Sequence, residues 1–156
     1  MGACTKLKLY RTKFIAAAMG VVLHLMGSVA CAQGDSSADP LADPKSPLAK
    51  RSIYFDHDST AIRDEYRETI KAHANYLAGD PKRRLILQGN TELRGSRETS
   101  LAIGGLRAEA VRAALLALGV SPGKMEAVSL GQEKPRALGR DQESSAENRR
   151  VDLVYP

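Results

Sequence analysis

The sequence predicts an α+β fold, in which two helices pack on one face of a mixed sheet. Two observations lead to this prediction. Short apolar runs bounded by turn residues, which are typical of strands, alternate with longer segments whose apolar residues recur at helical spacing. The order along the chain is strand, helix, strand, helix, strand, strand, or β-α-β-α-β-β, and 156 residues leave room for one domain.

The first strand covers residues 53–55, and a polar turn at residues 56–59 leads into the first helix. The helix is predicted from apolar residues at three- and four-residue intervals, namely Ile62, Tyr66, Ile70, Ala74 and Leu77. Gly79 and Pro81 then end it. We expect His73 on the flank of this helix.

The second strand covers residues 85–88, and a polar loop separates it from the second helix. That helix is predicted from Leu101, Gly104, Ala108, Val111, Leu115 and Leu118, and it ends at Gly119. A glycine inside a helix costs about 1 kcal/mol. We therefore expect Gly104 and Gly105 to let another backbone or a ligand approach closely.

Two further strands are predicted at residues 125–130 and 150–155, separated by the Gly- and Pro-rich stretch 131–141. Inserting the last strand among the earlier ones would allow short, right-handed crossovers. A Rossmann half is the weaker alternative, because no GxGxxG motif follows either early strand.

Residues 1–30 have the pattern of a secretory signal peptide. A basic start with no acid is followed by the apolar run FIAAAMGVVLHLMGSVA and small residues. An uncleaved membrane anchor is the alternative, and the run lies at the short edge of spanning length. The sequence around Cys31 resembles the lipobox of bacterial lipoproteins, in which the cysteine becomes the lipidated first residue. Cleavage after Ala32, at an A-x-A site, stays open as the alternative.

Residues 31–51 are predicted to be a flexible linker, and the folded domain is predicted to cover residues 52–156. The segment is rich in proline and poor in large apolar residues, so it cannot repay the entropy of ordering. The formal charge of +5 does not indicate a nucleic-acid partner. Removing the four basic residues of the signal peptide leaves nineteen Lys and Arg against eighteen Asp and Glu, a net charge of +1.

Several segments of the predicted domain resemble the OmpA-like peptidoglycan-binding domain. Residues 55–62 match its opening FDxDSxxI, and residues 89–95 match the frame of its GHxDxxG loop. The RAxxV helix and the closing NRRV match residues 107–111 and 148–151, and residues 131–135 are near in form to the GxxxxP turn. The likeness extends over almost the whole predicted fold, and the linker is similar to that of the family's lipoprotein members.

The resemblance implies that the loop after the second strand binds the diaminopimelate of a peptidoglycan stem peptide. An acid in the loop, here Glu92, would receive the ammonium of this residue, and Arg107 would receive its carboxylate. A planar guanidinium suits a carboxylate because it can donate two parallel hydrogen bonds. Three residues depart from the family: Asn90 stands in place of histidine, Glu92 in place of aspartate and Ser100 in place of asparagine.

Arg94 and Arg149 complete the set of expected peptidoglycan-binding residues. Of Arg149 and Arg150, one is expected to face an acid such as Asp56 and the other to line the site or the sheet edge. Replacing Glu92 or Arg107 is expected to weaken binding and to leave the thermal midpoint nearly unchanged. No cofactor is expected. No metal is expected either, because three adjacent side chains such as residues 56–58 cannot all converge on one ion in an extended chain.

The resemblance further implies a non-catalytic protein that tethers the outer membrane to the cell wall from its periplasmic face. Its partners would be peptidoglycan, the membrane through a lipid anchor on Cys31, and Tol-system or other envelope proteins. A soluble periplasmic form is the alternative location. Two other functions stay open, a scaffold that binds only envelope proteins and a cell-wall hydrolase. The sequence disfavours the hydrolase because GxSxG, HExxH and a Cys–His pair for catalysis are absent.

Overall fold

The computed structural model describes residue 41 and residues 43–156. The signal peptide, Cys31 and most of the expected linker lie outside these residues, so the predictions made for them remain predictions.

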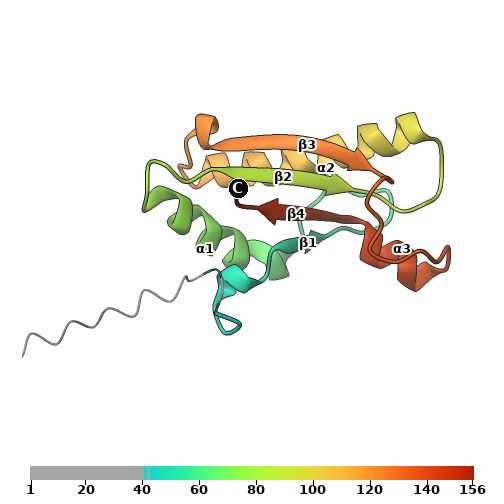
Figure 1. Cartoon of the computed structure of the whole chain (residues 1–156), viewed down its shortest axis with the longest axis horizontal. Coiled ribbons are helices and arrows are strands. Elements are labelled where there is room, and N and C mark those ends of the chain that lie inside the picture. The colour runs from blue at the N-terminus through green and yellow to red at the C-terminus, as the bar shows by residue number, and fades with distance from the viewer. Residues whose placement is uncertain (1–40, 42) are drawn as a thin grey trace, which may run out of the picture. The chain divides into compact units, whose positions relative to one another are not determined.

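Within the described part of the chain, four strands form a single mixed sheet. They are β1 (Ser52–Tyr54), β2 (Leu85–Asn90), β3 (Met125–Gly131) and β4 (Arg150–Val154), in the order β1-β4-β2-β3 (Figure 1). β4 pairs antiparallel with β1 and β2, whereas β2 and β3 are parallel. The last strand therefore lies between the two earliest ones, which confirms the predicted insertion.

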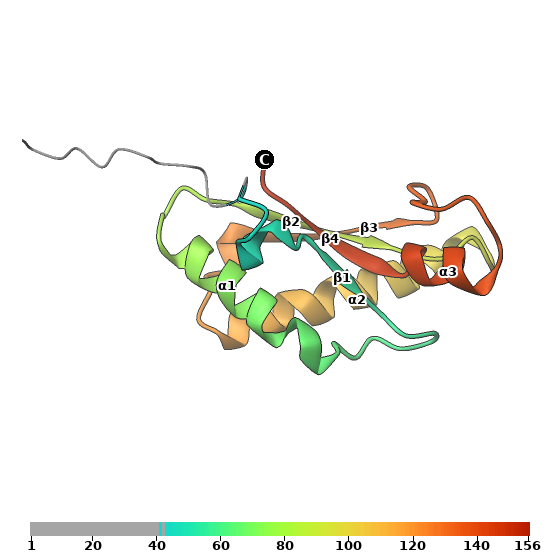
Figure 2. The ribbon, with the colours of Figure 1, turned by 90° about the horizontal axis from the view of Figure 1, so that it is seen from below.

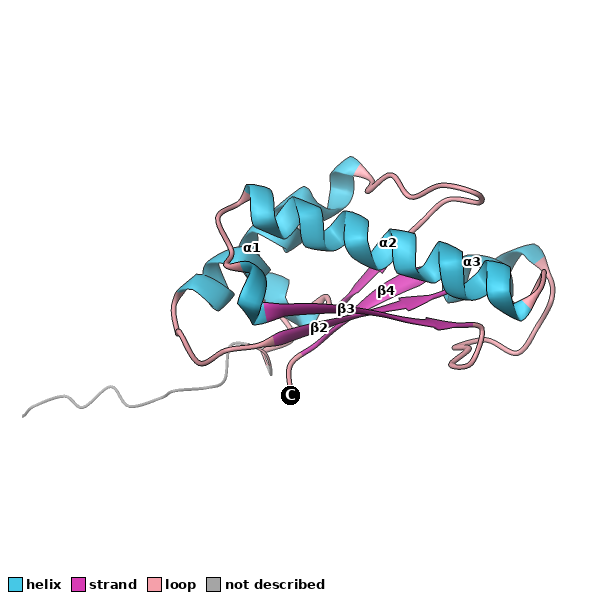
Figure 3. Cartoon of the chain, turned by 90° about the horizontal axis from the view of Figure 1, so that it is seen from above, coloured by secondary structure: helices cyan, strands magenta, loops and turns pink. Residues whose placement is uncertain are grey.

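Two long helices, α1 (Arg67–Ala78) and α2 (Arg97–Ala117), lie on the same side of the sheet (Figures 2 and 3). This arrangement confirms the predicted α+β fold. In Figure 1 the strands lie in front of α2, so the viewer faces the side without the long helices. Among residues 41 and 43–156, no helix is both long and apolar enough to cross a membrane.

The helix starts differ from the expected ones. α1 begins at Arg67, after a short 3₁₀ turn at Asp64–Tyr66, because the chain around Arg63 is still extended. Ile62 lies in that extended segment and packs against the core. The apolar residues therefore recur at helical spacing even before α1 begins. α2 begins earlier than its first apolar residue, since the Ser96 side chain accepts a hydrogen bond from the Thr99 amide at 3.1 Å and caps it.

A third helix, α3 (Gln142–Asn148), was not predicted. Its sequence QESSAEN contains a single apolar residue, so no apolar period marks it. Asp141 caps it by accepting a hydrogen bond from the Ser144 amide at 2.8 Å. The Asn148 side chain, fully buried, bonds the backbone of residues 136 and 137 and fixes the loop that precedes α3.

The core lies between the sheet and the two long helices. On β2, Leu85 and Leu87 are buried on this side, and Gly89 continues the same face. A Cβ built on Gly89 would lie 1.9 Å from the Gly104 carbonyl oxygen, and one on Gly104 would lie 3.0 Å from the Gly89 oxygen. The expected close approach is therefore confirmed for Gly104. At Gly105 the nearest atom is 3.8 Å away, so that glycine is not required.

The segment just before β1 packs on the domain. It forms a 3₁₀ turn at Pro47–Ala49 that contacts α1, and Leu48 is buried. The Nε2 of His73 lies 3.1 Å from the Lys50 carbonyl oxygen, and its Nδ1 lies 2.7 Å from the Tyr155 hydroxyl. His73 is fully buried, so its expected place on the helix flank is wrong. The domain boundary at residue 52 remains a prediction, but the structure attaches part of the expected linker to α1.

Only one neutral tautomer of the His73 imidazole fits its two hydrogen-bond partners. A carbonyl oxygen can only accept, so Nε2 carries the hydrogen and Nδ1 accepts from the Tyr155 hydroxyl. Burial lowers the pKa of His73, and the nearby charge of Arg51 lowers it further, against the Lys50 bond that raises it. Burial likewise raises the pKa of the Tyr155 hydroxyl. The neutral pair is therefore part of the packed core.

Candidate functional site

Glu92 lies two residues beyond the end of β2 and is held by two basic side chains. Its Oε2 accepts a hydrogen bond from Nη1 of Arg149 at 2.9 Å, and its Oε1 lies 3.4 Å from Nε2 of His57. The Glu92 side chain is 16% exposed. The expected loop acid is therefore mostly enclosed, and a guanidinium already pairs with one of its two oxygens.

Arg149 is a rigid partner for Glu92. It lies between α3 and β4, and its side chain is only 7% exposed. Its Nε donates to the Phe55 carbonyl at 3.2 Å, while the Phe55 amide donates to the Arg149 carbonyl at 2.9 Å. Three hydrogen bonds thus connect the residue after β1, the loop after β2 and the residue before β4.

Arg149 and Arg150 both face acids, as expected for one of them, but neither acid is Asp56. The Asp56 carboxylate bonds the Arg63 guanidinium, which lowers the pKa of Asp56. Arg150 instead donates to both oxygens of Asp152. The sequence alone could not rank these acids, because the arginines and their partners are brought together only by the pairing of β4 with β1 and β2.

Arg107 approaches the same segment from α2. Its Nε donates to the Ser59 carbonyl at 3.0 Å, its Nη2 donates to the Asp56 carbonyl at 3.1 Å, and the residue is 2% exposed. Burial lowers the pKa of Arg107, and the charge of Arg149 lowers it further, whereas Glu92 and Asp58 raise it. The structure therefore brings Arg107 into the electrostatic field of Glu92.

Together these residues form a polar cluster around the segment 55–59, which we call the Glu92 cluster: His57, Asp58, Glu92, Arg107 and Arg149. It contains two acids and two arginines. Such a balanced set suits a ligand that carries both an ammonium and a carboxylate, since each ligand charge finds one of opposite sign. Ser100 is buried on the same side of α2 as Arg107, seven residues away and close to two turns.

Asn90 belongs to a different set of contacts. It is 1% exposed, and its Nδ2 donates to the Gln88 carbonyl at 3.0 Å and to Asp152 at 3.3 Å. Asp152 also accepts from Arg150 and from the Ser52 hydroxyl. The partners of the Asn90 side chain are therefore on β2 and β4 and not in the Glu92 cluster.

Arg94 lies at the far end of the loop and is exposed. Its Nη2 donates to the Arg140 carbonyl at 2.6 Å. Both arginines line a polar cavity of about 530 Å³ that none of the Glu92 cluster lines. The structure thus separates Arg94 from Glu92, Arg107 and Arg149.

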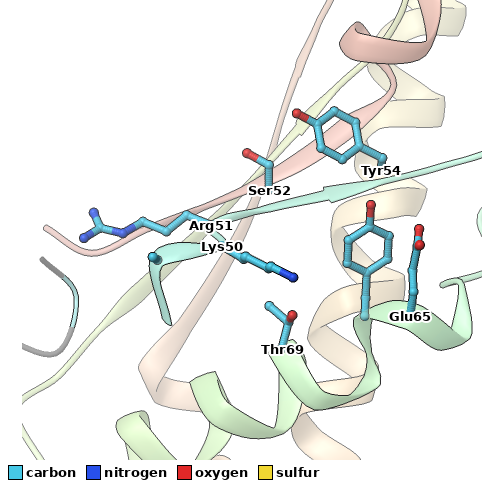
Figure 4. Close-up of a pocket in the computed structure, with 8 residues that line it drawn as sticks. Lys50, Arg51, Ser52, Tyr54, Glu65 and Thr69 are labelled. Carbon is cyan, nitrogen blue, oxygen red and sulfur yellow. The ribbon is translucent and has the colours of Figure 1, made fainter. Parts of the chain in front are cut away.

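Another cavity of about 410 Å³ lies beside β1 (Figure 4). Figure 4 shows Lys50, Ser52 and Tyr54 on one side of it and Glu65 and Thr69 on the helical side. None of the site residues expected from the sequence lines this cavity. Within the part of the chain that the structure describes, no group of three or more His, Cys, Asp or Glu side chains is placed to hold a metal ion.

Sequence reasoning missed two features of the cluster. His57 was considered only as a metal ligand, although the segment FDHDS places it two residues from Phe55, whose backbone Arg149 binds. The pairing of Glu92 with Arg149 joins residues 57 positions apart. A sequence pattern gives no distance between two such residues, so only the folded chain identifies the pair.

The comparisons with known proteins agree with this architecture. The model of the OmpA family matches residues 54–149, which is more than half of the chain. The chain belongs to the OmpA family. This OmpA-family chain is 42% identical over 113 residues to a peptidoglycan-associated lipoprotein of Pseudomonas aeruginosa, covering 72% of this chain and 67% of the relative. Its counterpart in Pasteurella multocida is 38% identical over 144 residues, covering 86% and 96%.

Solved structures show the same OmpA-family fold. The crystal structure of the peptidoglycan-associated lipoprotein from Burkholderia pseudomallei is 58% identical, with a TM-score of 0.74, and the match covers 76% of this chain and all of that one. The C-terminal domain of Helicobacter pylori MotB is 21% identical, with a TM-score of 0.62, and covers 67% and 83%. The second likeness shows the fold alone.

Proposed function

We propose that this OmpA-family chain is a non-catalytic protein of the cell envelope that binds the diaminopimelate of a peptidoglycan stem peptide. The observation that carries the proposal is the Glu92 cluster, in which opposite charges converge on one segment of backbone. The names of its relatives, peptidoglycan-associated lipoproteins, support the same ligand.

The ammonium of the ligand would bind at Oε1 of Glu92, because Arg149 occupies Oε2. The carboxylate would bind at Arg107. Nε and Nη2 of Arg107 donate to backbone carbonyls, while Nη1 has no hydrogen-bond partner among the described residues. A guanidinium nitrogen has two N–H groups there, so it can still donate to a carboxylate. Ser100 would contribute a hydroxyl from the first turns of α2.

Asn90 and Arg94 would act mainly by holding the loop that carries Glu92. Asn90 attaches the start of the loop to Asp152, and Arg94 attaches its end to the Arg140 backbone. The Thr91 amide donates to the Gly131 carbonyl at 2.8 Å between these points. A loop fixed at both ends presents its acid with little entropy to lose on binding.

We also propose where the protein is located and which partners it contacts. Acylation of Cys31 would anchor the protein in the outer membrane, and the chain up to Ser52 would let the domain reach the cell wall from the periplasmic side. Envelope proteins such as the Tol system would be further partners.

A second candidate function is a scaffold that binds only envelope proteins. It is favoured by one observation, namely that Arg149 and His57 already contact both oxygens of Glu92. If these contacts neutralise the acid fully, a ligand ammonium gains little by binding there.

Sedimentation of the purified chain with isolated peptidoglycan sacculi separates the candidates. We expect the wild type to co-sediment and Glu92→Gln to do so much less. Glu133→Gln is the matched control, because Glu133 is an acid in an exposed ion pair with Arg97 at 2.8 Å. A wild type that stays in the supernatant favours the scaffold, and loss of sacculus mass indicates a hydrolase.

A further inference from the structure

His57 lies at the rim of the Glu92 cluster, between its two acids. Its Nδ1 is 3.1 Å from Asp58 and its Nε2 is 3.4 Å from Oε1 of Glu92. The His57 side chain is 55% exposed, so both water and a ligand can reach it. The turn that carries it is closed by a bond from the Ser59 amide to the Asp56 carbonyl at 3.3 Å.

The two oxygens of Glu92 have different neighbours. Oε2 is held by Arg149, which is itself fixed to the Phe55 carbonyl and almost fully buried. That oxygen cannot exchange its partner without moving the end of β1. Oε1 is therefore the oxygen that an incoming cation can use, and the imidazole of His57 lies beside it.

The charged groups near His57 come from several elements, and its chain neighbour Asp56 is paired with Arg63. Asp58 adjoins it in the chain, Glu92 comes from the loop after β2, Arg149 precedes β4, and Arg107 comes from α2 within the field of both acids. With a neutral imidazole, two acids balance two arginines. A protonated imidazole adds a third cation at the oxygen that the ligand ammonium needs.

We propose that His57 is a specificity-determining residue of this site, which as a neutral imidazole leaves Oε1 of Glu92 to the ammonium of a diaminopimelate peptide and as an imidazolium competes with it. The inference rests on the proposed function. A histidine side chain gains a positive charge in more acidic solution. Binding of the peptide therefore weakens on acidification, and replacing His57 removes this pH dependence.

The test is titration calorimetry of the chain, expressed without its signal peptide, with a synthetic tripeptide that contains diaminopimelate. Wild type, His57→Gln and His57→Lys are measured at about pH 8 and about pH 5.5. An exposed ion pair changes an affinity by a factor of up to about five. We expect the wild type to bind about two- to fivefold more weakly at the lower pH, His57→Gln to bind equally at both, and His57→Lys to bind weakly at both.

The variants separate this inference from the proposed function. His57→Gln retains His73, so any pH response of the buried histidine is present in both proteins and cancels in the comparison. A wild-type pH response that persists in His57→Gln overturns the role of His57 and leaves the proposed function standing. Absence of binding by wild type and His57→Gln at both pH values overturns both. Thermal melts of each variant at each pH verify that the proteins are folded.

Discussion

Replacing Gly89 by alanine should destabilise the fold far more than the same replacement at Gly104 or Gly105, the glycines of α2. Gly89 faces α2, where the added Cβ would lie 1.9 Å from the Gly104 oxygen and 2.6 Å from its carbonyl carbon. Both are backbone atoms, so no side-chain rotation relieves the overlap. Either α2 or β2 has to shift.

The shift is costly because α2 contacts β2, β3 and β4 at once. Overpacking a core costs about 1–3 kcal/mol, and here the rigid neighbour places the expected loss of unfolding free energy at about 3 kcal/mol. For a domain of this size each kcal/mol shifts the thermal midpoint by about 4–8 °C, so Gly89→Ala should lower it by about 12 °C or more.

The matched control is Gly105→Ala, one residue beyond Gly104 on the same helix. Its nearest neighbour would be 3.8 Å away, an ordinary contact. Alanine is about 1 kcal/mol better than glycine inside a helix, so this variant should raise the midpoint. Thermal melts followed by circular dichroism compare the two. A Gly89→Ala protein that melts within about 2 °C of the wild type would refute the backbone contact, since that is less than 1 kcal/mol.

Three further predictions concern stability. Because burial lowers the pKa of His73, the folded state should be most stable above about pH 6.5. Below that pH its unfolding free energy, measured by urea titration, should fall by up to about 1.4 kcal/mol per pH unit. His73→Gln should remove this pH dependence. Leu48→Ala should cost about 2 kcal/mol and Leu138→Ala, at an 81% exposed leucine, almost nothing; equal midpoints in urea would show that Leu48 is not packed. Arg107→Ala should cost about 2 kcal/mol because two backbone carbonyls lose their donor, and an unchanged urea midpoint would contradict those bonds.

The last of these predictions revises the expectation from sequence. Replacing Arg107 was expected to weaken binding and to leave the thermal midpoint nearly unchanged. In the structure Arg107 is 2% exposed and bonds the backbone of residues 56 and 59. A substitution there therefore changes stability together with binding. A change in the ligand is the cleaner test of this arginine.

The sequence predicted the fold well because strand and helix periods are local properties. Residues 85–88 and the apolar positions of α2 identify their elements without knowledge of the rest of the chain. α3 was not predicted because its seven residues have no apolar face. Its existence depends on the Asp141 cap and on Asn148, which bonds a loop eleven and twelve residues away.

The candidate site could be predicted only in part. Glu92 and Arg107 were identified through a family resemblance, and the structure brings them to the same segment of backbone. Asn90 bonds Asp152 on β4, 62 residues away, and Arg94 bonds Arg140 in the loop before α3, 46 residues away. The first contact depends on the pairing of β4 with β2 and the second on the path of the loop before α3, and neither leaves a local pattern in the sequence.

The most direct test of the site is a comparison of two synthetic tripeptides that differ only in one carboxylate. One contains diaminopimelate and the other contains lysine, which retains the side-chain ammonium but lacks the second carboxylate. A charge-assisted hydrogen bond contributes about 1.5–3 kcal/mol, or roughly 10- to 100-fold in affinity. Calorimetry with the unmodified chain should show diaminopimelate binding tighter by that factor. Equal affinities for the two peptides would contradict a carboxylate site at Arg107.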